Sequence, residues 1–276
     1  MIITVANKAG ACYGVNRALE LALGCQDALQ PVHTLGPLIH NPIVVSDLAS
    51  RGITEAAGLD DAGSGTVVIR SHGMPPQVID EARERGFNVV DATCPFVSKV
   101  QMNARMLGEE GYRVVIIGEA GHAEVEGIRA WCGDAVLAVV EEPDELPGEL
   151  PERIGVVVQT TQSEERYNRV LEALQARCGD VRAFKTICSA TQQRQQAAQE
   201  LASVSDAMVV IGGRNSGNTR RLVEICAKQC PTHHIEAASE LNPAWFVGAE
   251  RVGITAGAST PQSHIDAVVA VLELVG

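Results

Sequence analysis

Three cysteines in this sequence share one local setting. Cys12, Cys94 and Cys188 each follow a short apolar segment and directly precede a segment of helical periodicity. The start of a helix presents unpaired N–H groups and the positive end of its dipole, so a thiol there is biased toward the metal-binding thiolate. The three positions divide the chain almost into thirds, which is too wide a spacing for a zinc finger. They could share a metal only where three lobes meet at an axis.

A second group of polar residues follows the predicted strands. Small residues ahead of helix starts supply N–H donors suited to phosphate, and histidines add cationic or hydrogen-bonding contacts. Because ligands of open α/β sheets bind beyond the carboxyl ends of the strands, we expect these loops to face one cavity. Glu124 is the one carboxylate among them, suited to donate a proton with a threonine hydroxyl holding it in place. The loops are His40-Asn41, Ser71-His72-Gly73, Gly121-His122-Ala123-Glu124, Gln159-Thr160-Thr161, Asn215-Ser216-Gly217-Asn218 and Ala258-Ser259.

The elements that must position these residues alternate between strand and helix. About nine strand–helix units are readable, three in each third of the chain, and continuous apolar runs such as VVII and VVVI predict parallel sheets buried on both faces. We expect three small α/β lobes with pseudo-threefold symmetry around a shared centre, at 1–93, 94–187 and 188–276. Each lobe would carry one of the three cysteines. The acidic, proline-containing stretch at 141–153 predicts a surface loop within the second lobe.

The other five cysteines are interpreted as bystanders. Cys25, Cys132 and Cys178 have no such setting and fit a buried core. Cys226 and Cys230 lie four positions apart on a predicted helix and could share a metal, but that spacing recurs by chance.

Composition narrows the class of protein. With 46% hydrophobic and 20% charged residues the chain has ample core material, and its net charge of −12 argues against a nucleic-acid surface. The sequence starts without a basic leader and holds no apolar run of roughly 18 residues, so we expect a cytoplasmic protein that does not span a membrane. An anionic substrate would need local donors.

Several motifs, in order along nearly the whole chain, carry a family resemblance. The sequence resembles the LytB or IspH family of 4-hydroxy-3-methylbut-2-enyl diphosphate reductases, which complete the methylerythritol phosphate route to isoprenoids. The matching segments are ANKAGACYGVNRA, IHNPIVV, SHGMP, DATCPFVSKV, AGHAEVEG, QTTQS, ICSATQQRQ, NSGNTRRL and ITAGAST.

The resemblance implies a role for each matching residue. Cys12, Cys94 and Cys188 would hold one [4Fe–4S] cluster and leave one iron open to the substrate oxygen. Glu124 would deliver protons with help from Thr160. Two positions depart from the family pattern: Ala11 stands where Phe is frequent, and Gly217 replaces a frequent serine, although its backbone N–H remains. The substrate would be surrounded by His40, His72, His122, Gln159, Thr191, Ser216, Gly217, Asn218 and Ser259.

The implied activity is a reductive dehydroxylation of the allylic diphosphate to isopentenyl and dimethylallyl diphosphate. Electrons would come from a donor such as a ferredoxin or flavodoxin. Two alternatives remain open: an iron–sulfur dehydratase resembling quinolinate synthase, which needs no net reductant, and a non-enzymatic iron–sulfur redox sensor. The GH-x-E and NSGN loops fit the first less well, and six polar loops are more than the second needs.

Overall fold

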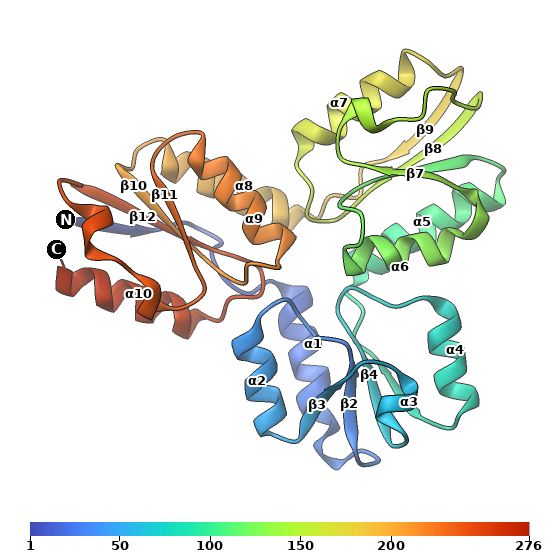
Figure 1. Cartoon of the computed structure of the whole chain (residues 1–276), viewed down its shortest axis with the longest axis horizontal. Helices are drawn as coiled ribbons and strands as arrows, with labels where there is room; N and C mark the ends of the chain where they lie inside the picture. The colour runs from blue at the N-terminus through green and yellow to red at the C-terminus, as the bar shows by residue number, and fades with distance from the viewer. Residues whose placement is uncertain (276) are drawn as a thin grey trace. The chain divides into compact units, whose positions relative to one another are not determined.

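A computed structural model describes residues 1–275 of the chain. They form three sheets of four strands, all paired in parallel and ordered β3-β2-β4-β5, β7-β6-β8-β9 and β11-β10-β12-β1 (Figure 1). All three sheets share one topology when the strands of each sheet are counted along the chain and β1 is counted after β12. The first strand then lies between the second and the third, and the fourth is an edge strand beside the third. A parallel three-lobed α/β fold is therefore confirmed.

The strands are short, and each sheet has its own helices. The first sheet consists of β2 (Val32–Leu35), β3 (Ile53–Ala56), β4 (Thr66–Ile69) and β5 (Asn88–Asp91). The second consists of β6 (Arg113–Ile117), β7 (Val136–Val140), β8 (Arg153–Val158) and β9 (Asp180–Phe184). The third consists of β10 (Ala207–Ile211), β11 (Thr232–Ile235), β12 (Arg251–Ala256) and β1 (Ile2–Val5). The α-helices are α1 (Tyr13–Leu23), α2 (Pro42–Ser50), α3 (Leu59–Ala62), α4 (Pro76–Glu84), α5 (Pro95–Glu109), α6 (Ala123–Cys132), α7 (Glu164–Gln175), α8 (Ser189–Ala202), α9 (Gly217–Ala227) and α10 (Gln262–Val275).

The described chain divides into two compact units. One unit holds the third sheet and comprises residues 1–15, 40–42 and those from Ser189 onward. The other unit holds the first and second sheets and comprises residues 16–39 and 43–188. None of the helices described is long and apolar enough to cross a membrane.

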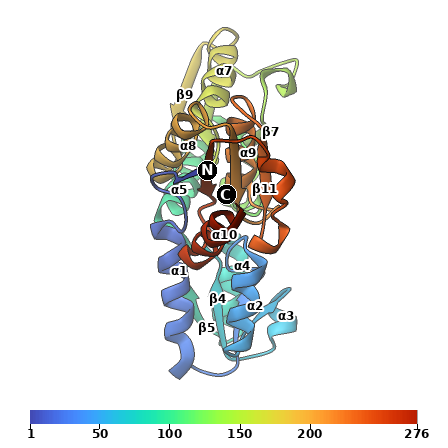
Figure 2. The ribbon, with the colours of Figure 1, turned by 90° about the vertical axis from the view of Figure 1, so that its left-hand side faces the viewer.

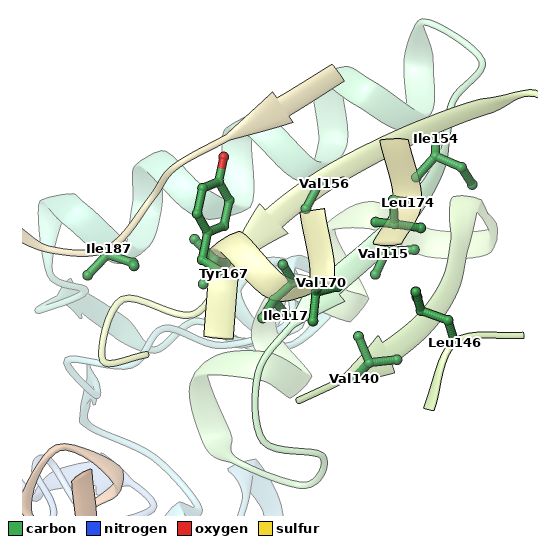
Figure 3. Close-up of a cluster of buried hydrophobic side chains, with 11 residues drawn as sticks. Val115, Ile117, Val140, Leu146, Ile154, Val156, Tyr167, Val170, Leu174 and Ile187 are labelled. Atoms are coloured by element: carbon green, nitrogen blue, oxygen red, sulfur yellow. The ribbon is translucent and has the colours of Figure 1, made fainter. Parts of the chain in front are cut away.

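Alternation along the central strands explains why the sheets are covered on both faces. In β6, Val115 and Ile117 join a core with α7, seen in Figure 3, whereas Val114 and Ile116 pack against α5 and α6 on the opposite face. Successive side chains of a strand point to opposite faces, so an uninterrupted apolar run is what a doubly covered sheet requires. The same holds for β10, all of whose residues are buried.

The N-terminal strand does not belong where the sequence suggested. The sequence assigned residues 1–93 to the first lobe, but β1 pairs in parallel with β12, so the first residues complete the third sheet. β1 and α10 lie side by side (Figures 1 and 2). The physical reason for the difference is that the apolar pattern of residues 2–5 predicts a strand but not its partner, which is β12 rather than a strand of the first sheet.

Three strands were missed by the count of strand–helix units. β3, β7 and β11 are the second strands of their sheets, and none is followed by a helix of more than four residues. A count based on a strand followed by a long amphipathic helix passes over them. The predicted acidic loop is confirmed between β7 and β8, where the only regular structure described is a single 3₁₀ turn at Pro143–Glu145.

Candidate active site

The three cysteines occupy equivalent positions in the fold. Each lies beyond the fourth strand of a sheet and directly precedes a helix, as the sequence predicted. Each also donates its backbone N–H to a carbonyl two residues beyond the end of the third strand of that sheet: Cys12 to Ala258 at 3.0 Å, Cys94 to Ser71 at 2.9 Å and Cys188 to Thr160 at 3.0 Å. All three side chains are half-buried.

A single metal ion and an iron–sulfur cluster place different demands on three cysteines. Among the side chains that the structure describes, no three of His, Cys, Asp or Glu are gathered closely enough to share one metal ion. An iron–sulfur cluster makes a different demand, because it presents a separate iron to each thiolate. That the three cysteines meet at one centre stays a prediction, with Cys12 in one compact unit and Cys94 and Cys188 in the other.

Burial disfavours the thiolate form of the remaining cysteines. It raises the pKa of Cys132 to about 11 and that of Cys226 to about 12. It also raises the pKa of Cys25, Cys178 and Cys230. Since the thiolate is the metal-binding form, their environment fits their interpretation as bystanders.

Glu124 is a buried carboxyl held by one partner. It lies in the first turn of α6 with 1% of its surface exposed, and it accepts hydrogen bonds from the Thr160 N–H at 2.7 Å and the Thr160 hydroxyl at 2.8 Å. Burial raises the pKa of Glu124 to about 7, although the two hydrogen bonds from Thr160 act in the opposite direction. A carboxyl with this pKa can both carry and release a proton near neutral pH.

Two histidines lie close to each other in the same unit. His122 caps α6, and its Nδ1 accepts the Glu124 N–H at 3.1 Å, which assigns the proton of the neutral ring to Nε2. His72 lies in the loop after β4, with its ring edge-on to His122 and the two centroids 5.6 Å apart. Gln159 is buried, and its Oε1 accepts the Glu119 N–H at 2.9 Å, which ties the loops after β6 and β8 together.

The other unit gathers the remaining predicted residues around the start of α9. Ser216 caps this helix by accepting the Thr219 N–H at 3.3 Å, and Gly217 is its first residue. Asn218 is 3% exposed, and neither its Oδ1 nor its Nδ2 has a hydrogen-bond partner. Such a buried amide is normally satisfied, so this one marks a position where a ligand would supply the partner.

Two further segments belong to this unit. The half-buried His40 precedes Asn41, whose Nδ2 donates to the Ser259 carbonyl at 2.7 Å and so fastens the His40 segment to the loop after β12. Thr191 lies buried on α8. Sequence reasoning missed two arginines, Arg17 and Arg194, which contact the loops ahead of two of the cysteines. The signal available was their similar distance from a preceding cysteine, five and six positions.

Fold and site together define a class: an α/β enzyme of three parallel sheets, with a proton-holding carboxyl and three equivalent thiols at helix starts. The chain belongs to the LytB family, since the family model described as LytB protein matches residues 3–273. The family resemblance seen in the motifs is thereby confirmed.

Curated relatives match over nearly their whole length. A 4-hydroxy-3-methylbut-2-enyl diphosphate reductase of Pelobacter propionicus is 48% identical over 271 residues, which is 97% of this chain and 96% of the relative. The reductase of the same name from Geotalea uraniireducens is 46% identical over 276 residues, covering 99% of this chain and 97% of the relative.

Two solved structures of diphosphate reductases are similar to this chain in fold and sequence. One described as (E)-4-hydroxy-3-methyl-but-2-enyl diphosphate reductase, the terminal enzyme of the non-mevalonate pathway, has a TM-score of 0.72 at 42% identity and covers 99% of this chain and 100% of its own. The E-1-hydroxy-2-methyl-but-2-enyl-4-diphosphate reductase from Plasmodium falciparum has a TM-score of 0.92 at 27% identity, covering 98% of this chain and 87% of its own.

Proposed function

We propose that this chain is a reductase of an allylic diphosphate, converting 4-hydroxy-3-methylbut-2-enyl diphosphate into isopentenyl and dimethylallyl diphosphate. The reaction takes two electrons and two protons, breaks one C–O bond, forms one C–H bond and releases water. The observation that carries the proposal is the buried Glu124 carboxyl, partly protonated near neutral pH, in a chain whose full-length relatives bear this reductase name.

The residues present fit an iron–sulfur cluster, and the family is one of iron–sulfur enzymes. Cys12, Cys94 and Cys188 would hold a [4Fe–4S] cluster, which supplies single electrons and Lewis acidity when bound. Their equivalent backbone anchors support this choice over the other five cysteines, whose pKa burial raises.

Glu124 would donate a proton to the leaving hydroxyl. Hydroxide is a poor leaving group, and protonation turns it into water. Thr160 contributes a hydroxyl and a backbone N–H to the same carboxylate, so it would orient Glu124 and stabilise the anion left after proton transfer.

The start of α9 carries the proposed diphosphate site. The unpartnered Asn218 amide and the N-terminus of α9 support an anion site in the unit of the third sheet. His72 and His122, in the unit of the first and second sheets, have ring nitrogens that suit the same kind of ligand. These local donors would offset the net charge of −12, which otherwise repels an anion. The proposed set is His40, His72, His122, Gln159, Thr191, Ser216, Gly217, Asn218 and Ser259.

Electron supply and location complete the proposal. A small one-electron carrier such as a ferredoxin or flavodoxin would reduce the protein, and the chain would work in the cytoplasm without binding nucleic acid or membrane.

The test is anaerobic purification, iron and sulfide analysis, and an assay on the allylic diphosphate with and without a chemical reductant. We expect product only with reductant, with two electrons consumed for each water released. Product without reductant would favour the dehydratase, and a cluster without turnover would favour the sensor. Cys94→Ser should lower the iron content, whereas the matched control Cys178→Ser should not.

A further inference from the structure

An arginine of the third lobe holds the chain ahead of Cys12. Arg194 lies in the second turn of α8 and is 3% exposed. Its Nη2 donates to the Gly10 carbonyl at 2.8 Å, and its Nη1 donates to the Ala190 carbonyl at 3.3 Å. A buried guanidinium is tolerated only where backbone or carboxylate oxygens receive its hydrogens, so this side chain is committed to the loop before Cys12.

Backbone hydrogen bonds also hold this loop, from the Ala9 N–H to the Ala6 carbonyl at 3.2 Å and from the Cys12 N–H to the Ala258 carbonyl at 3.0 Å. Gly10 has a φ of +94°, and a Cβ there would lie 3.2 Å from the Ile265 side chain, so the backbone must bend here without a side chain. The Gly10 N–H donates to the Ala256 carbonyl at 3.4 Å, which is long, while the Gly10 carbonyl accepts from Arg194 on the other side. Arg194 therefore supplies the shorter of these two anchors at Gly10.

The first lobe has a similar contact between an arginine and the backbone ahead of a cysteine. Arg17, in the second turn of α1, donates from Nη1 to the Thr93 carbonyl at 3.1 Å and from Nη2 to the Asp91 carbonyl at 3.5 Å. Thr93 directly precedes Cys94, and its N–H is held by the Asp91 carboxylate at 2.9 Å. In both lobes an arginine of the helix that follows one cysteine donates to the loop that precedes another cysteine.

The second lobe differs. The position equivalent to Arg17 is Lys99, five residues after Cys94, and its side chain is exposed. The loop ahead of Cys188 is held instead by Thr186, whose hydroxyl accepts the Val158 N–H at 2.9 Å. The backbone ahead of Cys12 and of Cys94 is thus held by an arginine, and the backbone ahead of Cys188 by a neutral threonine.

We propose that Arg17 and Arg194 are positioning residues that fix Cys94 and Cys12 for cluster binding and place a positive charge beside these two thiolates. The charge effect rests on the proposed cluster, whereas the positioning does not. A cluster becomes more negative when it is reduced, so a fixed cation nearby favours the reduced state and raises the reduction potential.

The positioning is tested in cluster-free protein by amide hydrogen exchange. Arg194→Met should speed exchange of the Cys12 amide by about tenfold or more, the effect of losing a charged hydrogen bond, and leave Cys94 unchanged. Arg17→Met should do the reverse, and Lys99→Met should change none of the three cysteine amides. Unchanged exchange in both arginine variants, or equal acceleration at all three cysteines, would overturn the positioning role.

The charge is tested by redox titration of the loaded protein. Each Arg→Met variant should lower the midpoint potential, each Arg→Lys variant should recover most of it, and Lys99→Met should have no effect. Arg17 is only half-buried, so its variants keep the test available if Arg194→Met does not fold. Potentials equal to wild type in both Arg→Met proteins would overturn the charge effect. Failure of the reductase assay alone would leave both measurements interpretable.

Discussion

Two effects shift the pKa of Glu124 in opposite directions. Burial disfavours the carboxylate, and the two hydrogen bonds from Thr160 favour it. Burial is the larger, and the resulting pKa of about 7 leaves the carboxyl partly protonated at neutral pH. A fully ionised carboxylate would have no proton to give, and a carboxyl without Thr160 would be slow to release one.

Replacing Glu124 by Gln should therefore reduce turnover by at least about a hundredfold, since the amide keeps the shape but carries no transferable proton. Iron content and binding of the diphosphate should stay close to wild type, measured by iron analysis and calorimetry. Glu126→Gln is the matched control: Glu126 lies on the same helix, is exposed and pairs with Arg129. Near-normal turnover of Glu124→Gln would remove Glu124 from proton delivery.

The same carboxyl should make stability depend on pH. Its pKa is about 7 in the folded chain and close to the ordinary value of 4.5 when unfolded, so between these values the folded state binds more protons. Stability should thus fall as pH rises from about 4.5 to 7 and level off above, by about 3 kcal/mol at most.

Urea unfolding of cluster-free protein at pH 5 and pH 8 measures this effect. Glu124→Gln lacks the ionisation, so the variant should gain on wild type at pH 8 and show little such gain at pH 5. Parallel pH profiles for the two proteins would contradict the raised pKa.

Part of this chemistry was readable from residue types. The pairing of Glu124 with a threonine was predicted, because a lone carboxylate among polar loops needs a hydroxyl partner. The missing hydrogen-bond partners of Asn218 were not, since burial depends on how α9 packs. Arg194 was also missed, because a guanidinium in the polar run TQQRQQ gives no sign that it is buried.

At the scale of elements, one loop conformation controls where His72 lies. Gly73 has a φ of +74°, and a Cβ there would come within 2.4 Å of Nε2 of Gln101, a buried side chain of α5. The loop after β4 is thus fitted against α5, and His72 is placed by that fit.

Gly73→Ala should raise KM for the diphosphate more than it lowers kcat and should destabilise the fold by about 1–3 kcal/mol through backbone strain and overlap. Gly86→Ala is the control, since Gly86 has a φ of +82° with no atom within 4 Å of an added Cβ. It should lose only the smaller, strain-related part of the stability and leave KM unchanged. Steady-state kinetics and urea unfolding compare the two; an equal KM in both variants would show that the fit against Gln101 does not place His72.

On the scale of the whole molecule, the sequence predicts three similar lobes but not which lobe owns the first strand. Apolar periodicity reports that residues 2–5 form a strand, but it carries no information on a partner about 250 positions away. We propose lobes at 12–93 and 94–187, with the third formed by 188–276 together with 1–11. Each cysteine then marks the junction where one lobe ends and the next begins.

Deleting residues 1–5 should accordingly loosen the third sheet and spare the first. Backbone amides of β12 should exchange faster because β1 covers its edge, and iron content should fall because the anchor of Cys12 lies next to β12. Exchange in β2 and β4 is the internal control. Faster exchange there, with β12 unchanged, would contradict the assignment of β1 to the third lobe.

The pairing of β1 with β12 also sets an order of events during synthesis. Residues around Cys12 are made early, yet their anchors at Ala256 and Ala258 are translated 246 residues later. The anchors of Cys94 and Cys188, at Ser71 and Thr160, are already made when those cysteines appear. The nascent chain can therefore shape two of the three thiol positions as it grows, but the third only after β12 and the loop that follows it have been made. Delivery of the cluster should follow synthesis of β12, and ribosome-bound chains stalled before residue 250 should carry no stable iron.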